Sequence, residues 1–495
     1  MNLSLTQLIR PSLFLAAIFV FAGYPVHAQD IEAKITLIAP ARVRIEGKFL
    51  DPKFATNNWT FLQRYADVEN LGKRIDKLLL FDKDGIEVAV KKFAPGIYEA
   101  SGDAMSWQYE VSVEPPDEPT AAAHVSWLAE DGGLLMTEDL LPRVDKNESL
   151  HLSARISLDL PPGWAVNSPD LKTEDLYFSP DISRSVFQVG RNWRESNLVI
   201  TGHSLRFFIR GEWQFTDQEA IGIAGDILSE HFKTFGEMPA EKMSVILSPF
   251  PRPVEPGRWR AETRGSTVVL LSSQMPFKSQ GLNRLHEQLR HEIFHFWVPN
   301  KLALTGNYDW FFEGFTLYQA LKTGKKVNRI HFSDVLDTLG RAYTLNESSD
   351  RGLSLIEASK KRWDGNFGFV NSRGMMVAFM CDAAILSSSK GKRSLTDLFQ
   401  KVYRLHNSSK PLQDGNAAIL EIIKSYPELN EIRARYIEGR EKLALTPVLL
   451  QTGLETEVKA GLTTFRIRQK LTGRQKQLLL RLGLNPLYEF PENTK

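Results

Sequence analysis

Cysteine is nearly absent from this chain of 495 residues, in which Cys381 is the single example. One cysteine forms no intramolecular disulfide, so stability in an oxidising compartment has to come from packing. The neighbours of Cys381 are mostly apolar and typical of a helix, which favours a buried structural thiol over a nucleophile. The sequence is therefore not that of a disulfide-stapled scaffold.

An excess of charge is missing as well. Lys+Arg total 61 and Asp+Glu total 59, so the formal net charge is only +2. Nucleic-acid-binding domains usually carry a strong basic excess or a clustered basic stripe, and the sequence has neither. Long apolar runs are also lacking. In the chain beyond the N-terminus, no apolar run approaches the roughly 20 residues that a membrane-spanning helix needs. We therefore expect no nucleic-acid partner and no stable membrane insertion of the mature protein.

The first 28 residues have the pattern of a signal peptide. Arg10 precedes a short apolar run at 13–22, and the small residue Ala28 comes before Gln29. A basic flank, a short apolar core and a small residue at the cleavage point are typical of secretion signals, and the run is too short to anchor a membrane protein. We expect cleavage after Ala28 and an exported protein, periplasmic in a Gram-negative source and otherwise secreted.

The remaining chain is long enough for about two to four domains. Residues 29–205 are expected to form a β-rich domain, because segments 107–113 and 152–160 alternate apolar and polar residues with the period of a half-buried strand. From 206 to 445 the pattern changes to mixed and then mainly helical. Residues 446–495 form a short C-terminal extension of unclear fold. The expected fold class is α+β, with an all-β domain first.

A His-Glu-x-x-His motif lies at His291–His295, in a predicted helix over about 281–298. Residues four apart occupy one face of a helix, about 6 Å apart along the axis, so both imidazoles can reach one zinc ion. Apolar residues recur every three or four positions beside that face. The other interpretation, a surface helix whose polar side chains are solvated or paired, does not explain this apolar context.

The third ligand is expected from the next helix, predicted over about 310–322. Glu313 is the one acidic residue in that apolar segment, and a carboxylate in such surroundings is costly unless it meets a metal or a paired charge. Asp309 is a candidate N-cap of the same helix. Two imidazoles and one carboxylate leave the fourth zinc position open for water, whose pKa zinc lowers towards 7. Glu292 is then the candidate general base.

These segments resemble the gluzincin metallopeptidases and, within them, the glycyl aminopeptidase family, over roughly residues 85 to 445. The motifs that carry the resemblance are Leu160-Pro161-Pro162-Gly163-Trp164, His291-Glu292-Ile293-Phe294-His295-Phe296-Trp297, Trp310-Phe311-Phe312-Glu313-Gly314-Phe315-Thr316 and Arg373-Gly374. The resemblance implies a thermolysin-like catalytic fold behind an N-terminal β-domain, one zinc per chain and an aminopeptidase that acts on peptides or proteins.

Three departures from that family bear on function. Its Gly-Gly-x-Glu-His stretch is replaced by Trp-Arg-Ala-Glu-Thr at 259–263, which keeps Glu262 as a candidate for binding a substrate's amine or as an ordinary loop carboxylate. Its tyrosine before the Arg-Gly pair is missing, which leaves Asn371, or Tyr343 from elsewhere, as the candidate transition-state donor. The residues from 446 to 495 are too few for the PDZ module found in many relatives.

The lost tyrosine makes a second function a serious alternative: a zinc-bearing protein with weak or no turnover that binds peptides or a partner protein. An extended peptide can add to a sheet edge by main-chain hydrogen bonds in either case. A purely structural protein conflicts with the presence of both histidines and both glutamates of the motif. Side-chain preference, exo- versus endopeptidase action and oligomeric state do not follow from the sequence.

Overall fold

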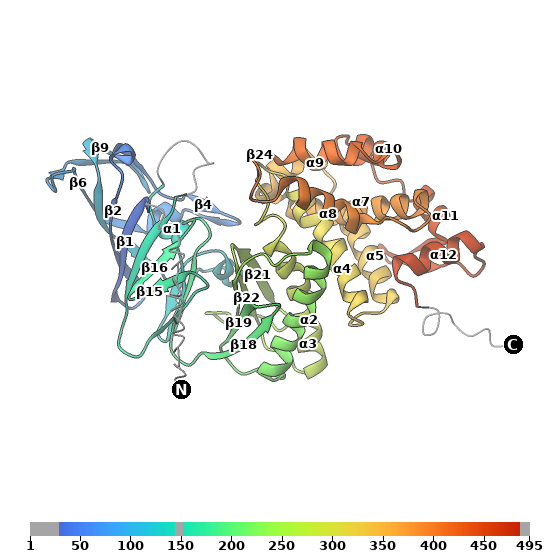
Figure 1. Ribbon diagram of the computed structural model, residues 1–495, viewed down its shortest axis with the longest axis horizontal. Coiled ribbons are helices and arrows are strands. Elements are labelled where there is room, and N and C mark those ends of the chain that lie inside the picture. The colour runs from blue at the N-terminus through green and yellow to red at the C-terminus, as the bar shows by residue number, and fades with distance from the viewer. Residues whose placement is uncertain (1–28, 144–151, 486–495) are drawn as a thin grey trace, which may run out of the picture.

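The computed structural model describes residues 29–143 and 152–485, so the predicted signal peptide lies outside the described residues. Figure 1 shows two lobes side by side, a β-rich lobe from the N-terminal part of the chain and a mainly helical lobe from the C-terminal part. The predicted α+β fold, with an all-β domain first and a mixed, then mainly helical domain behind it, is confirmed.

The β-rich lobe is built on an eight-stranded sheet with the order β15-β16-β13-β1-β2-β10-β6-β7. Its strands are β1 (Ile31–Ala39), β2 (Arg42–Phe49), β6 (Ile75–Phe81), β7 (Glu87–Val88), β10 (Ser106–Ser112), β13 (Ala154–Asp159), β15 (Leu171–Thr173) and β16 (Leu176–Ser179). The two alternating segments noted in the sequence become β10 and β13. In β13 the side chains of Ala154 and Ile156 are fully buried, as the period of two predicts.

Smaller sheets complete this lobe. One contains β11 (Trp127–Ala129), β12 (Gly132–Met136), β14 (Ala165–Asn167) and β17 (Val186–Gly190), and another contains β3 (Thr56–Thr60), β8 (Val90–Ala94) and β9 (Ile97–Ala104). A short hairpin, β4 (Arg64–Tyr65) and β5 (Val68–Glu69), extends towards the helical lobe. A side chain of this hairpin, Arg64, reaches Asp364 of the helical lobe at 2.7 Å.

Between the lobes lies a five-stranded sheet with the order β18-β19-β20-β22-β21. Its strands are β18 (Arg194–Ile200), β19 (His203–Ile209), β20 (Lys242–Pro249), β21 (Trp259–Arg264) and β22 (Thr267–Ser272). β19, β20 and β22 are parallel, and β18 and β21 are the antiparallel strands at the two edges. The domain boundary predicted at 205 falls inside β19, because β18 and β19 pair with this sheet rather than with the β-rich lobe.

Both faces of that sheet are covered, and each by a different part of the chain. Phe207 and Val245 pack under the helices α2 (Asp217–Phe235) and α3 (Lys278–Glu292). Phe208 and Ile246, one position along each strand, pack with Trp127 and other residues of the β-rich lobe. Because neighbouring residues of a strand point to opposite faces, this sheet belongs to the cores of both lobes.

The helical lobe is centred on α7 (Phe367–Ser388), which packs against α4 (Thr316–Lys326), α5 (Phe332–Ser349), α6 (Leu355–Lys360) and α8 (Leu395–His406). The helix α9 (Gly415–Lys424) packs against α8. Together with the preceding turn, Arg362–Ser388 is long and apolar enough by length and composition to cross a membrane, contrary to our expectation for the chain beyond its N-terminus. Because 89% of its most apolar window is buried inside the protein, its apolar character is that of a core helix.

The C-terminal extension is folded onto the helical lobe within its described part. It contains α11 (Thr446–Thr452), the hairpin β25 (Leu454–Lys459) and β26 (Leu462–Ile467), and α12 (Gly473–Leu482). Leu454, Phe465 and Leu479 are buried in the same apolar cluster as the helices around α7. The extension therefore completes the helical core and contributes no element to the five-stranded sheet.

Candidate metal centre

The two histidines of the motif lie at a change of helix type. α3 ends at Glu292 and continues as the 3₁₀ turn η4 (Ile293–Phe296), so His291 sits on α-helix and His295 on the tighter turn. The predicted uninterrupted helix over about 281–298 is therefore shorter, and its last turn differs in type. Leu289 and Ile293 are fully buried and hold this segment against the core. The two Nε2 atoms of the histidines face each other at 3.1 Å.

Glu313 approaches the histidines from the next helical segment. This segment begins as a π-helical turn, η5 (Trp310–Phe315), and continues into α4. One carboxylate oxygen, Oε2, lies 3.3 Å from Nε2 of His291 and 3.8 Å from Nε2 of His295. The three ligand atoms all lie within 4.8 Å of one another, which is the grouping that the sequence predicted. Single π-helical turns are frequent at functional sites because they redirect a side chain.

A close approach of two backbones fixes the position of Glu313. A Cβ atom on Gly314 would lie 2.5 Å from the Cα of Gly374, so only glycine lets η5 and α7 come this near. Both glycines belong to motifs singled out in the sequence. Their role is to seat the Glu313 turn against the central helix, which places the carboxylate over the end of α3.

The hydrogen bond of His295 fits a metal-bound histidine, whereas Nδ1 of His291 is buried without a partner among the described residues. Nδ1 of His295 lies 2.8 Å from the carbonyl oxygen of Val298, so it carries the proton and donates it there. This leaves the lone pair of Nε2 directed at the centre, the usual arrangement of a metal-bound histidine. Burial and the neighbouring His291 lower the pKa of His295, so the ring is neutral. Two imidazole nitrogens and a carboxylate in this arrangement are a donor set suited to zinc.

The second oxygen of Glu313 is held by an arginine that the sequence did not single out. Nη1 of Arg362, from the turn η6 (Arg362–Asn366), donates to Oε1 of Glu313 and to Oδ1 of Asp309, each at 3.0 Å. Burial opposes ionisation of Glu313, but Arg362 and the histidines outweigh it, so the pKa of Glu313 lies well below its usual value. Asp309 pairs with Arg362 and makes no capping bond, so the prediction that it caps the Glu313 helix is wrong.

Glu292 is buried beside the centre and is fixed by one hydroxyl. Oγ1 of Thr263, on the edge strand β21, donates to Oε2 of Glu292 at 2.7 Å and lies 2.9 Å from its backbone oxygen. Among the described residues no hydrogen bond uses Oε1, which is left free to accept a proton. Burial raises the pKa of Glu292 to about 7.

Glu262 lies on the same edge strand, but its carboxylate is already occupied. Tyr65 from the β4–β5 hairpin and Nε of Arg264 both donate to Oε1, the latter at 2.9 Å, and Nδ1 of His124 contacts Oε2. Burial would raise the pKa of Glu262, but Arg264 and His124 outweigh it and lower it to about 2. A substrate amine would have to displace one of these three partners, so the geometry favours Glu262 as a link between the lobes.

Sequence reasoning missed Tyr65 and His124, which come from the β-rich lobe. Neither lies in a motif, and both are far from β21 in the chain, so no signal in the sequence connects them with Glu262. Nε of Arg260 bonds Nε2 of His124 at 2.7 Å and extends the same network. The β-rich lobe therefore supplies side chains to the edge of the candidate centre.

The two predicted donor residues lie on the helices behind the centre. Asn371 is in the first turns of α7, and its Oδ1 is buried without a hydrogen-bond partner. Tyr343 is in α5, which packs against α7 and β26. Within the described ranges, no hydrogen bond links either residue to Glu313 or to the histidines, and both assignments stay predictions.

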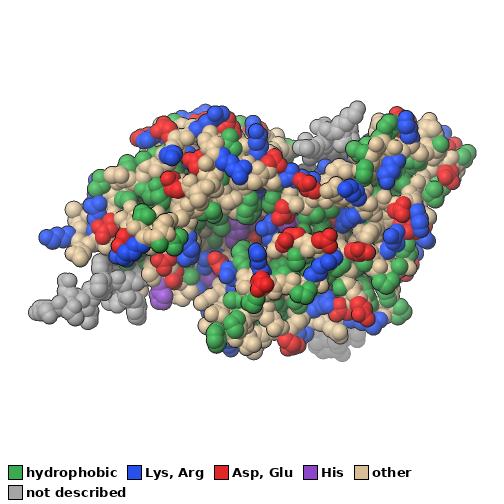
Figure 2. Space-filling view, turned by 180° about the vertical axis from the view of Figure 1, so that it is seen from behind, with side chains coloured by type: hydrophobic (Ala, Val, Ile, Leu, Met, Phe, Trp, Pro, Cys, Tyr) green, Lys and Arg blue, Asp and Glu red, His purple; other side chains and the backbone are tan. Residues whose placement is uncertain are grey.

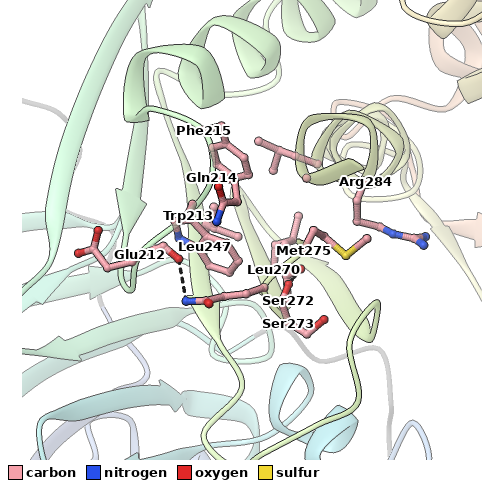
Figure 3. Close-up of a pocket in the computed structure, with 13 residues that line it drawn as sticks. Glu212, Trp213, Gln214, Phe215, Leu247, Leu270, Ser272, Ser273, Met275 and Arg284 are labelled. Carbon is pink, nitrogen blue, oxygen red and sulfur yellow. Dashed lines mark hydrogen bonds between the residues drawn. The ribbon is translucent and has the colours of Figure 1, made fainter. Parts of the chain in front are cut away.

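The surface is hollowed where the lobes meet. Figure 2 shows this hollow near the middle of the molecule, with a histidine side chain visible in its depth. A different, apolar pocket lies between β22 and the first turns of α3, where Trp213 and Phe215 stack with centroids 5.9 Å apart (Figure 3). Its volume is about 20 Å³, and its wall residue Arg284 precedes His291 by about 10 Å of helix. This pocket is separate from the metal centre.

Comparison with known proteins places the fold. The sequence matches no family model, and no curated protein matches it. Among solved structures, an aminopeptidase N family protein from Idiomarina loihiensis has a TM-score of 0.72 at 14% identity, covering 86% of this chain and 79% of its own. An M1 zinc metallopeptidase from Deinococcus radiodurans, in a mutant bound to a Tyr-Ser-Ala substrate, has a TM-score of 0.53 at 14% identity, covering 84% of this chain and 95% of its own.

The unsubstituted Deinococcus enzyme aligns equally well, with a TM-score of 0.53 at 13% identity over 84% of this chain and 95% of its own. At such identities the likeness concerns the fold. The chain thus shares the architecture of M1 zinc metallopeptidases, which agrees with the gluzincin resemblance of its motifs. The narrower resemblance to glycyl aminopeptidases stays a prediction.

Proposed function

We propose that this protein is a zinc-dependent peptidase that holds one zinc ion per chain. The observation that carries the proposal is the convergence of His291, His295 and Glu313, whose ligand atoms lie within 4.8 Å of one another, beside the buried carboxylate of Glu292. The shared fold with M1 zinc metallopeptidases supports the same assignment.

The chain's own residues supply the positioning and the proton transfer. His291, His295 and Glu313 would hold zinc, which supplies Lewis acidity towards a water molecule and a peptide carbonyl. Thr263 holds one oxygen of Glu292, so the other is oriented to take a proton from the attacking water. The same carboxyl group then gives that proton to the departing amine. Overall, one water molecule is consumed for each amide bond that is cleaved, and the products are one carboxylic acid and one amine.

Peptides or proteins are the proposed substrates. A neighbour of the same fold was solved with a Tyr-Ser-Ala substrate, which supports short peptides. The names of the neighbours and the resemblance of the motifs favour an aminopeptidase, whereas the three partners of Glu262 argue against recognition of a free amine by that carboxylate. We therefore propose a peptidase in which Glu262 does not select the N-terminus.

A peptide-binding protein with weak turnover is the second candidate. It is favoured by one observation: neither Asn371 nor Tyr343 is bonded to the centre in the described structure, so no oxyanion donor is assigned. Loss of one such donor costs roughly 10²–10³ in turnover. A slow enzyme and a zinc-bearing binder are separated by turnover, since both hold the metal.

The first test combines metal content with hydrolysis of a mixed-sequence peptide library, with and without a chelator. One zinc per chain and chelator-sensitive cleavage are expected. Glu292→Gln should keep the zinc and lose hydrolysis by about two to four orders of magnitude, because the general base is gone. Glu287→Gln, on an exposed position of the same helix, is the matched control and should keep full activity. Zinc without cleavage would favour the peptide-binding protein over the peptidase, and absence of zinc would refute both candidates.

Export of the protein is proposed on the pattern of residues 1–28 alone. Cleavage after Ala28 gives a mature chain that begins at Gln29. N-terminal sequencing of protein recovered from the exported fraction tests this. A chain that keeps Met1 in that fraction would contradict the cleavage site.

A further inference from the structure

A second pocket is lined by Asp309 and by Arg362, the arginine that also contacts Glu313. Its volume is about 270 Å³, and it lies between the β4–β5 hairpin and the turn that follows α6. The charged residues that line it are Arg64, Asp309, Lys360, Lys361, Arg362 and Asp364. Its volume is at the small end of the range for ligand sites, which suits one side chain or one terminal residue of a longer molecule.

The charges of this pocket do not cancel. Each of its two acids is already paired with an arginine, Asp309 with Arg362 at 3.0 Å and Asp364 with Arg64 at 2.7 Å. Lys360 is exposed and takes part in no ion pair with another described residue. Lys361 is likewise exposed and unpaired within the described ranges, so the pocket keeps two free positive charges.

One buried donor of the pocket is also unused. Arg362 is 8% exposed, and its Nε is buried without a hydrogen-bond partner. Its Nη1 makes both ion pairs with the neighbouring carboxylates. A buried guanidinium nitrogen without an acceptor is unfavourable, because the group has lost water without gaining a bond. A carboxylate is the acceptor that matches a guanidinium best.

The pocket adjoins the candidate centre through a single side chain. Arg362 Nη1 lies 3.0 Å from Oε1 of Glu313, and Oε2 of Glu313 lies 3.3 Å from Nε2 of His291. The guanidinium is thus two contacts from a histidine ligand. Arg362 is thus a wall that the pocket shares with the candidate centre.

We propose that this pocket is a subsite that binds a carboxylate of the peptide substrate, held by Lys360 and Lys361 at its mouth and by the Arg362 guanidinium at its base. The carboxylate comes either from the C-terminus of a short peptide or from an acidic side chain. This proposal rests on the proposed peptidase function, because the substrate is taken to be a peptide bound across Glu313 and the histidines.

Binding is measured on the zinc-loaded Glu292→Gln protein, so that no probe is consumed. Three N-acetylated pentapeptides are titrated by calorimetry: a neutral one with a free C-terminus, the same one as C-terminal amide, and an amide with one glutamate. At least one carboxylate peptide is expected to bind about tenfold more tightly than the neutral amide. Preference for the first identifies the terminal carboxylate, and preference for the third identifies an acidic side chain.

The lysines are then tested directly. The double variant Lys360→Gln, Lys361→Gln should bind the preferred carboxylate peptide about tenfold more weakly than the unsubstituted protein does. Its affinity for the neutral amide should be unchanged. The matched control is Lys390→Gln with Lys392→Gln, two exposed lysines at the far end of α7, which should change neither affinity.

Two results would overturn the subsite: equal affinity for all three peptides, or a carboxylate preference that survives the loss of both lysines. The peptidase proposal fails separately, by absence of zinc or of chelator-sensitive cleavage in the unsubstituted protein. If zinc does not bind, the same titrations on the metal-free protein still measure whether the pocket prefers peptides that carry a carboxylate. The two failures are therefore distinguishable.

Discussion

Arg362→Met is the substitution whose consequences follow most directly from the structure. Arg362 is the buried cation shared by Asp309 and Glu313, and its removal leaves two carboxylates without their partner. Removing one member of a buried ion pair costs about 3–5 kcal/mol of unfolding free energy. In the metal-free protein we expect a loss of this size, since nothing else in the described structure compensates both acids.

Zinc changes that balance. A cation held by Glu313 and the histidines compensates the charge on Glu313, so only Asp309 stays unpaired and the loss falls to about half, near 2 kcal/mol. The packing of Gly314 against Gly374 keeps the Glu313 turn in place without Arg362. Binding linkage then requires the variant to bind zinc more tightly, by about 2 kcal/mol or roughly thirtyfold.

The assay is urea unfolding followed by tryptophan fluorescence, with chelator and with saturating zinc, together with zinc affinity from competition with a chromophoric chelator. Asp309→Asn in the Arg362→Met background should recover part of the lost stability, because it removes one orphaned charge. Arg393→Met, which breaks an exposed pair with Glu428, is the control and should cost about 1 kcal/mol or less. A weaker zinc affinity in Arg362→Met would refute the reasoning, since orientation of Glu313 by Arg362 would then outweigh charge.

Three further predictions follow from other contacts. Because Glu262 is held by the β-rich lobe, free and N-acetylated peptides should be cleaved at rates within about threefold in a comparative assay, and strong discrimination would contradict the assignment. Burial lowers the pKa of His231 to about 3, so the folded state keeps the ring neutral while the unfolded state takes up a proton below about pH 6.5. The free energy of unfolding is therefore kept above that pH and falls as the pH is lowered, by about 2 kcal/mol at pH 5. Urea unfolding at pH 7 and pH 5 measures this loss, and His231→Gln should remove the part that comes from His231. Gly314→Ala should destabilise by about 1–3 kcal/mol in the same measurement, whereas Gly222→Ala, in an open position of α2, should be neutral or slightly stabilising.

The grouping of the proposed zinc ligands was predictable from features of single helical segments. His291 and His295 lie four residues apart, and the geometry of one helix turn brings them together whatever the rest of the chain does. Glu313 was predictable because an isolated carboxylate in an apolar helix needs a partner. The structure groups these three residues as expected, although neither the 3₁₀ turn at His295 nor the π-helical turn at Glu313 has a recognisable sequence signal.

The rest of the site depends on contacts between distant segments. Glu262 was identified as a carboxylate near the centre, but its partners Tyr65 and His124 come from another lobe, and pairings of this kind have no periodicity to reveal them. Arg362 was missed for the same reason, since its role depends on how the turn after α6 folds back onto Asp309. Near the predicted boundary at 205 the sequence could not assign β18 and β19 to a sheet, because a strand of one sheet looks like a strand of another until its pairing is known.

The shared sheet between the lobes has a consequence for the modular use of this protein. A fragment cut out at Arg194 would keep the three proposed zinc ligands and Glu292, yet it would expose to water the sheet face that carries Phe208, Ile246 and Val269. An uncovered apolar sheet face invites aggregation. The N-terminal lobe therefore covers an apolar face that its neighbour does not bury by itself, and truncation, domain exchange or display as a fusion has to keep the two lobes together.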